Sequence, residues 1–107
     1  MNEKIRTNLV KKILEKAQKM NKNVPINPNE ISYKHCKIIA DFLGENTHEN
    51  TIAHLFGVSS YKLTQTLKPE LEQRIAVFLG FDKFTDLEDE LMRNLVLQEF
   101  LTFINQK

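Results

Sequence analysis

A run of polar side chains near the middle of the chain has the chemistry that binds nucleic acid. Hydroxyl groups, one amide and two ammonium groups occur within ten residues. Such groups donate hydrogen bonds to phosphate oxygens and to the edges of bases, the two contacts by which proteins hold and read duplex DNA. The candidate DNA contacts are Thr51, Ser59, Ser60, Tyr61, Lys62, Thr64, Gln65 and Lys68.

Two of these residue types have specific partners on duplex DNA. The amide of Gln65 suits a bidentate contact with adenine, and the ammonium groups of Lys62 and Lys68 suit phosphate or guanine. If these side chains project from one face of a helix, they can enter the major groove together. We therefore expect the surrounding sequence to form this helix and a second element that holds it in place.

The segment from residue 50 to residue 67 is patterned as two short helices joined at a glycine. Gly57 can end the first helix, because glycine adopts the left-handed conformation at little cost. Val58 can enter the core, and Ser59 or Ser60 can cap a second helix over residues 59–68. The apolar residues recur at helical spacing on both sides of the glycine, and they are Ile52, Ala53, Phe56, Leu63 and Leu67. This pattern predicts a helix-turn-helix.

Further helices flank this segment. Amphipathic spacing with prolines or glycines at the breaks predicts helices over residues 2–20, 32–43, 69–79 and 85–105. We expect Ser32 to cap the second helix and Asn50 or Thr47 to cap the helix before Gly57. Thr85 and Glu88 have the spacing of a capping box. In the connector between the first two helices, Val24 and Ile26 are candidates to reach the core.

These elements predict an all-α fold, a compact domain of five to six helices with a central helix-turn-helix. Its 107 residues suffice for one hydrophobic core. The predicted parts of this single domain, residues 1–107, are a basic amphipathic helix (1–20), a connector (21–31), a helix-turn-helix core (32–84) and a C-terminal helix (85–105).

Charge is unevenly distributed along the chain. The net charge is +1, yet residues 1–24 carry seven lysine or arginine side chains and two glutamates. The remainder has eight basic and twelve acidic residues. The basic face of the first helix predicts phosphate contacts through Lys11, Lys12, Lys16 and Lys19, although a solvated face without a partner is the alternative.

The C-terminal helix is too apolar for one narrow buried stripe. Residues 95–104 contain seven apolar side chains, which predicts burial on more than one side. The helix can pack across the first helix of its own chain, or it can pair two chains. The expected residues of such a homodimer interface are Val96, Phe100, Phe103 and Ile104.

The sequence gives no support to several other functions. His35, Cys36, His48 and His54 lack the spacing of a zinc site, and the chain has no phosphate-binding loop, dinucleotide or hydrolase motif. We therefore expect no catalytic residues, no metal and no cofactor. No apolar run approaches the length of a membrane span, and the polar N-terminus lacks a signal region, which predicts a cytoplasmic protein without a membrane partner.

The block from Ser32 to Leu91 resembles the lambda-repressor-like (Cro/repressor, XRE-type) helix-turn-helix domain. The similarity rests on the Ile52-Ala53-x-x-Phe56-Gly57-Val58-Ser59 block, on Tyr61-Lys62-Leu63 with Leu67, and on a helix that starts at Pro69 and ends in Leu79-Gly80. The resemblance implies a transcriptional regulator that binds duplex DNA through its second motif helix, often as a dimer.

The near-neutral charge keeps a second hypothesis open. In this alternative, the chain is an adaptor that retains the helix-turn-helix as architecture and binds a partner protein through the apolar C-terminal helix. A continuous positive surface over the basic first helix and the second motif helix would favour DNA, whereas an apolar or acidic surface there would favour the adaptor.

Overall fold

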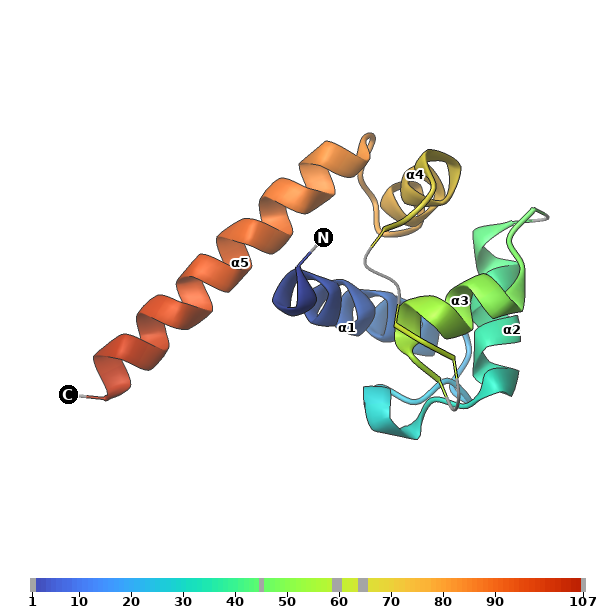
Figure 1. Ribbon diagram of the computed structural model, residues 1–107, viewed down its shortest axis with the longest axis horizontal. Coiled ribbons are helices and arrows are strands. Elements are labelled where there is room, and N and C mark those ends of the chain that lie inside the picture. The colour runs from blue at the N-terminus through green and yellow to red at the C-terminus, as the bar shows by residue number, and fades with distance from the viewer. Residues whose placement is uncertain (1, 45, 59–60, 64–65, 107) are drawn as a thin grey trace.

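The computed structural model describes residues 2–44, 46–58, 61–63 and 66–106, and over this part of the chain the fold contains helices and no strand. The prediction of an all-α fold is thus confirmed (Figure 1). The helical elements in chain order are α1 (Glu3–Met20), a 3-10 turn η1 (Pro28–Glu30), α2 (Tyr33–Leu43), α3 (Glu49–Phe56), α4 (Pro69–Phe78) and α5 (Phe84–Asn105).

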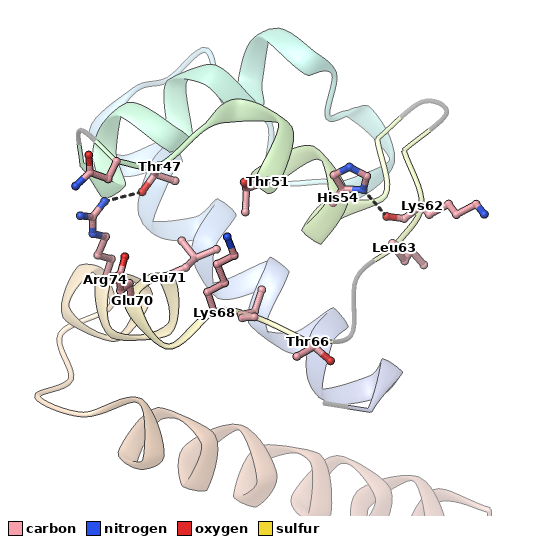
Figure 2. Close-up of a pocket in the computed structure, with 12 residues that line it drawn as sticks. Thr47, Thr51, His54, Lys62, Leu63, Thr66, Lys68, Glu70, Leu71 and Arg74 are labelled. Atoms are coloured by element: carbon pink, nitrogen blue, oxygen red, sulfur yellow. Dashed lines mark hydrogen bonds between the residues drawn. The ribbon is translucent and has the colours of Figure 1, made fainter.

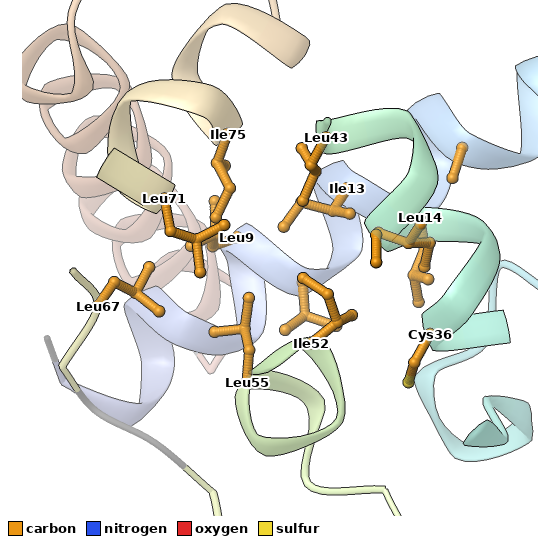
Figure 3. Close-up of a cluster of buried hydrophobic side chains, with 14 of the residues drawn as sticks. Leu9, Ile13, Leu14, Cys36, Leu43, Ile52, Leu55, Leu67, Leu71 and Ile75 are labelled. Carbon is orange, nitrogen blue, oxygen red and sulfur yellow. The ribbon is translucent and has the colours of Figure 1, made fainter. Parts of the chain in front are cut away.

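The core forms around the apolar face of α1. Leu9, Ile13 and Leu14 of α1 are fully buried. Figure 3 shows them facing side chains from α2, α3 and α4, and Leu67 from the segment before α4. At about 25 cal/mol per Å² of apolar surface, this burial is the main stabilising contribution of the fold. The other fully buried residues include Cys36, Ile39, Ile52, Leu55, Ile75, Leu87 and Leu91.

Two predicted helix starts agree with the structure, and a third does not. Asn2 caps α1, where its Oδ1 accepts a hydrogen bond of 2.8 Å from the Ile5 amide. Ser32 is the N-cap residue of α2. The cap of α3 was predicted at Asn50 or Thr47, but it is His48, whose Nδ1 accepts a hydrogen bond of 3.1 Å from the amide two residues later. An imidazole nitrogen can thus replace the side-chain oxygen of a common N-cap residue.

The second motif helix is the main difference from the sequence-based prediction. The described residues of this segment, 58, 61–63 and 66–68, are not helical. The following Pro69 forces Lys68 into extended backbone (φ −68°, ψ 144°), and the Tyr61 hydroxyl is bonded to Asn50 of α3. Leu63 was expected inside but is 45% exposed, whereas Val58 and Leu67 are buried as predicted.

The helix boundary at Gly57 is as predicted. This glycine is the C-cap of α3 and has the left-handed conformation (φ 66°, ψ 40°). Val24 of the connector is also buried as expected. Ile26 is 50% exposed, however, so the prediction that it reaches the core is wrong. Val24, together with the partly buried Ile31 and the contact of η1 with α1, holds this proline-containing connector against the core.

The long helix α5 crosses α1 and α4, and only its first part is buried. It begins at Phe84 with Lys83 as its N-cap, so the predicted capping box of Thr85 and Glu88 does not form. Burial of the Phe84 ring places the helix start one residue earlier. Two ion pairs, Lys12–Glu90 at 3.4 Å and Lys4–Glu99 at 3.2 Å, connect α1 with α5. Burial of the apolar C-terminal third on several sides was predicted, but only Leu95 is partly buried, and the other apolar side chains of this part are exposed.

Candidate nucleic-acid interface

A cleft of about 450 Å³ lies between α3, the segment before α4 and the first two turns of α4 (Figure 2). Its wall combines hydroxyl groups, cationic side chains and one carboxylate with three leucines, two of which are buried. The residues that line it are Asn46, Thr47, Thr51, His54, Lys62, Leu63, Thr66, Leu67, Lys68, Glu70, Leu71 and Arg74.

Three of the predicted DNA contacts meet at this cleft. Thr51 is an exposed residue of α3, and Lys62 and Lys68 come from the non-helical segment. In Figure 2, the Lys68 side chain rises into the cleft toward Thr51, whereas the Lys62 side chain points outward from its rim. The Pro69 start of α4 positions Lys68, because the residue before a proline takes an extended conformation.

The cleft also contains polar residues that were not predicted as contacts. Nη1 of Arg74 donates a hydrogen bond of 3.1 Å to the hydroxyl of Thr47, which holds the guanidinium at one end of the cleft. At the other end, the ring of His54 lies 3.1 Å from the Lys62 carbonyl oxygen through Nδ1. His54 follows Thr51 by three residues, so helical spacing alone would have placed both on one face of α3.

Tyr61 takes part in a cluster of side chains next to the cleft. Its hydroxyl donates a hydrogen bond of 2.9 Å to Oδ1 of Asn50, which also accepts from the hydroxyl of Tyr33. The two tyrosine rings stack with centroids 5.9 Å apart, and the rings of His54 and Tyr61 are perpendicular with centroids 4.8 Å apart. Partial desolvation and then the nearby Glu49 carboxylate raise the pKa of Tyr33.

This cluster changes the role expected for Tyr61. The side chain is half-buried and its hydroxyl is already bonded, so it anchors the non-helical segment against α2 and α3 instead of projecting freely. Four of the predicted contacts, Ser59, Ser60, Thr64 and Gln65, lie outside the described residues. Among the described residues, the candidate interface therefore consists of the predicted contacts Thr51, Lys62 and Lys68 and of Arg74 beside them.

The four α1 lysines that were predicted to contact phosphate do not form one open surface. Lys12 is half-buried and pairs with Glu90 of α5, which neutralises it. Lys16 and Lys19 are exposed. Lys11 lines a shallow groove together with Gly57 and Leu63, next to the non-helical segment. Of this set, Lys11 is the lysine that the fold places beside the candidate interface.

Arg6 also belongs to the basic N-terminal segment, but it has a structural position. It is 8% exposed, and its Nη1 donates a hydrogen bond of 3.2 Å to the carbonyl oxygen of Leu55. That carbonyl is in the last turn of α3, where the helix dipole attracts a positive charge. The guanidinium therefore stabilises the end of α3 and adds nothing to the surface charge.

The predicted dimer residues lie away from the cleft, on the distal part of α5. Val96, Phe100, Phe103 and Ile104 are between 46% and 59% exposed.

Among the described residues, no group of three or more histidine, cysteine or acidic side chains is placed to hold a metal ion. In the same part of the chain, no helix combines the length and the apolar character that crossing a membrane requires.

Comparison of the chain with protein-family models, with curated proteins and with solved structures gives no match.

Proposed function

We propose that this protein is a small DNA-binding regulator of the repressor type, and that the cleft beside α3 and α4 holds the backbone of duplex DNA. The observation that supports this proposal is the convergence of Lys62, Lys68 and Arg74 around one cleft. Lysine and arginine side chains supply most of the affinity of proteins for nucleic acid, because they replace the counterions of the phosphates.

The hydroxyl groups of the cleft fit the same ligand. Thr51 and Thr66 are exposed at the wall, and neutral donors of this kind position phosphates between the cationic groups. Glu70 is the acidic group of the lining and lies in the first turn of α4. Its charge opposes binding, which together with the near-neutral chain predicts modest affinity.

This proposal differs in one respect from the expectation for a repressor. Base reading by a second motif helix is not part of it, because the described residues between 58 and 68 are not helical. Lys62 and Lys68 keep their predicted role toward phosphate, and Arg74 joins them. The grip on the DNA backbone thus comes from three separate positions of the chain.

The salt dependence of binding tests the proposal. Three phosphate contacts predict that log Kobs falls with log [salt] with a slope of about −3, and that Lys68→Ala makes this slope about one unit shallower. Lys68 is suitable because its side chain makes no capping hydrogen bond in α4. The measurement is fluorescence anisotropy of a labelled 20-base-pair duplex between about 20 and 150 mM salt.

Lys22→Ala is the matched control. It removes the same charge from an exposed position in the connector after α1, which does not line the cleft. We expect this variant to bind like the wild-type protein. The proposal is wrong if duplex DNA fails to bind at low salt, or if the two substitutions weaken binding equally.

The adaptor is a second candidate function, and a different observation favours it. The exposed apolar side chains at the end of α5 provide a surface that suits protein contacts more than nucleic acid. An adaptor would show no measurable affinity for duplex DNA at low salt and would lose partner binding when this apolar surface is made polar. The anisotropy experiment therefore separates the two candidates.

A further inference from the structure

In the distal part of α5, polar side chains face α1 and apolar side chains face solvent, which is the reverse of the usual arrangement around a core. Its polar residues Gln98 and Thr102 face a groove shared with α1, and Glu99 pairs with Lys4. The opposite side is exposed and apolar. We call this side the distal apolar face, and it consists of Met92, Val96, Leu97, Phe100, Leu101 and Ile104, whereas Phe103 lines the groove shared with α1.

Helical geometry places the distal apolar face opposite the buried stripe of the same helix. Phe100 follows the buried Leu91 by nine residues, which is about two and a half turns. Figure 1 shows the C-terminal half of α5 extending past the N-terminal end of α1, away from α2, α3 and α4. No other described element of the chain covers this side.

We propose that the distal apolar face pairs with the same face of a second copy of this chain, with the two α5 helices antiparallel. Six large side chains that are each about half exposed present on the order of 600 Å² per chain. Two copies would bury up to about twice that area, which reaches the lower end of the range of stable specific interfaces. This inference does not depend on the DNA-binding proposal.

The charge of Arg93 determines the direction of the pairing. Arg93 lies on the same stripe as Leu97, Phe100 and Ile104, at spacings of four, three and four residues. A parallel pair would bring the two Arg93 side chains together, which is repulsive. An antiparallel pair centred on Phe100 places each Arg93 near the C-terminal end of the other helix, where the helix dipole attracts a positive charge.

The solution mass of the protein tests the pairing. We expect light scattering to give twice the chain mass of 12.5 kDa at micromolar to millimolar concentrations, and Phe100→Glu to give the single-chain mass. The Phe100 ring is 57% exposed, so its replacement leaves the core intact. Unchanged thermal unfolding of a dilute Phe100→Glu sample would show that the variant is folded.

Gln98→Glu is the control for the mass measurement. It adds the same charge to the same helix on the side that faces α1, and we expect it to leave the mass doubled. A wild-type protein that stays at the single-chain mass overturns the proposal, and so does a pair that survives Phe100→Glu. Because no DNA is present, failure here is independent of the binding experiment.

Thiol cross-linking tests the direction of the pair. In the antiparallel arrangement, position 96 of one copy lies near position 104 of the other. A mixture of Val96→Cys and Ile104→Cys chains should therefore cross-link with a short bismaleimide, and neither variant should cross-link alone. Efficient cross-linking of Val96→Cys alone overturns the antiparallel arrangement. The native Cys36 is fully buried and gives little background.

Discussion

Burial controls the chemistry of the two adjacent residues His35 and Cys36. Both lie on the inner side of α2. Burial raises the pKa of the Cys36 thiol to about 11, so at neutral pH it is an uncharged apolar group and a poor nucleophile. Burial, and then the neighbouring Lys34, lower the pKa of His35. The neutral ring of His35 accepts a hydrogen bond of 3.0 Å from the Ser32 amide through Nδ1.

His35 makes the free energy of unfolding depend on pH. Its pKa is near 6.5 in the unfolded chain and lower in the folded protein, so the unfolded chain binds more protons below pH 6.5. The contribution of His35 is fully present above that pH and is lost as the pH falls through the folded pKa. We expect the free energy of unfolding, measured by urea denaturation, to fall more between pH 7.5 and pH 5 in the wild type than in His35→Gln.

The glutamine in this variant keeps an acceptor at the third position of the helix and does not titrate. Other groups titrate equally in both proteins, so the difference between the two pH profiles isolates His35. Identical profiles would mean that His35 protonates without disturbing the α2 cap.

At the scale of elements, predictions of helix ends succeed where neighbouring residues set the end and fail where distant contacts set it. Gly57 and Ser32 act within a few residues of themselves, so the local sequence suffices to predict them. The start of α5 instead follows the burial of Phe84, a contact with distant parts of the chain. The non-helical segment depends in the same way on Asn50 and His54, whose side chains bond to Tyr61 and Lys62.

Gly57→Ala should reveal how tightly the turn after α3 packs. The left-handed conformation alone costs an alanine about 1–2 kcal/mol. A Cβ at this position would also lie 2.2 Å from Cδ2 of Leu63, so that side chain must move. We expect the free energy of unfolding to fall by more than about 1 kcal/mol, measured by urea denaturation.

Gly80→Ala provides a comparison for this effect. Gly80 also has a positive φ, of 90°, but a Cβ there meets no atom within 4 Å. We expect Gly80→Ala to destabilise the protein less than Gly57→Ala. An equal loss in both variants would show that the Leu63 side chain moves without cost.

At the scale of the whole molecule, α5 packs the C-terminal part of the chain against the N-terminal helix α1. Its buried part packs on α1 and α4, and two ion pairs join it to α1. Such exposed or half-exposed ion pairs contribute roughly 0–1 kcal/mol each, so the attachment depends on the buried leucines. The remaining half of the helix carries the distal apolar face.

Leu91→Ala tests this attachment. The side chain is fully buried, and a cavity at such a position costs about 2–5 kcal/mol. We expect the free energy of unfolding, measured by thermal and urea denaturation, to fall by this amount. Val77→Ala is the control, because its side chain on α4 is 61% exposed, and we expect a change within about 0.5 kcal/mol. A small effect of Leu91→Ala would indicate that α5 separates easily from the core.

The sequence by itself determined the helical class, five helices with boundaries close to those observed, and the burial of Val24, Val58 and Leu67. These features arise from backbone hydrogen bonds four residues apart, from prolines and glycines, and from periodic apolar faces, all of which are local.

Only the tertiary structure decided that the described part of residues 58–68 is not helical, that Lys12 is neutralised by Glu90, and that Arg74 meets Thr47 at the cleft. It also decided which side of α5 is covered. Each of these depends on residues that are close in space and distant in sequence. Helical periodicity describes one element at a time, so it contains no information about which elements become neighbours.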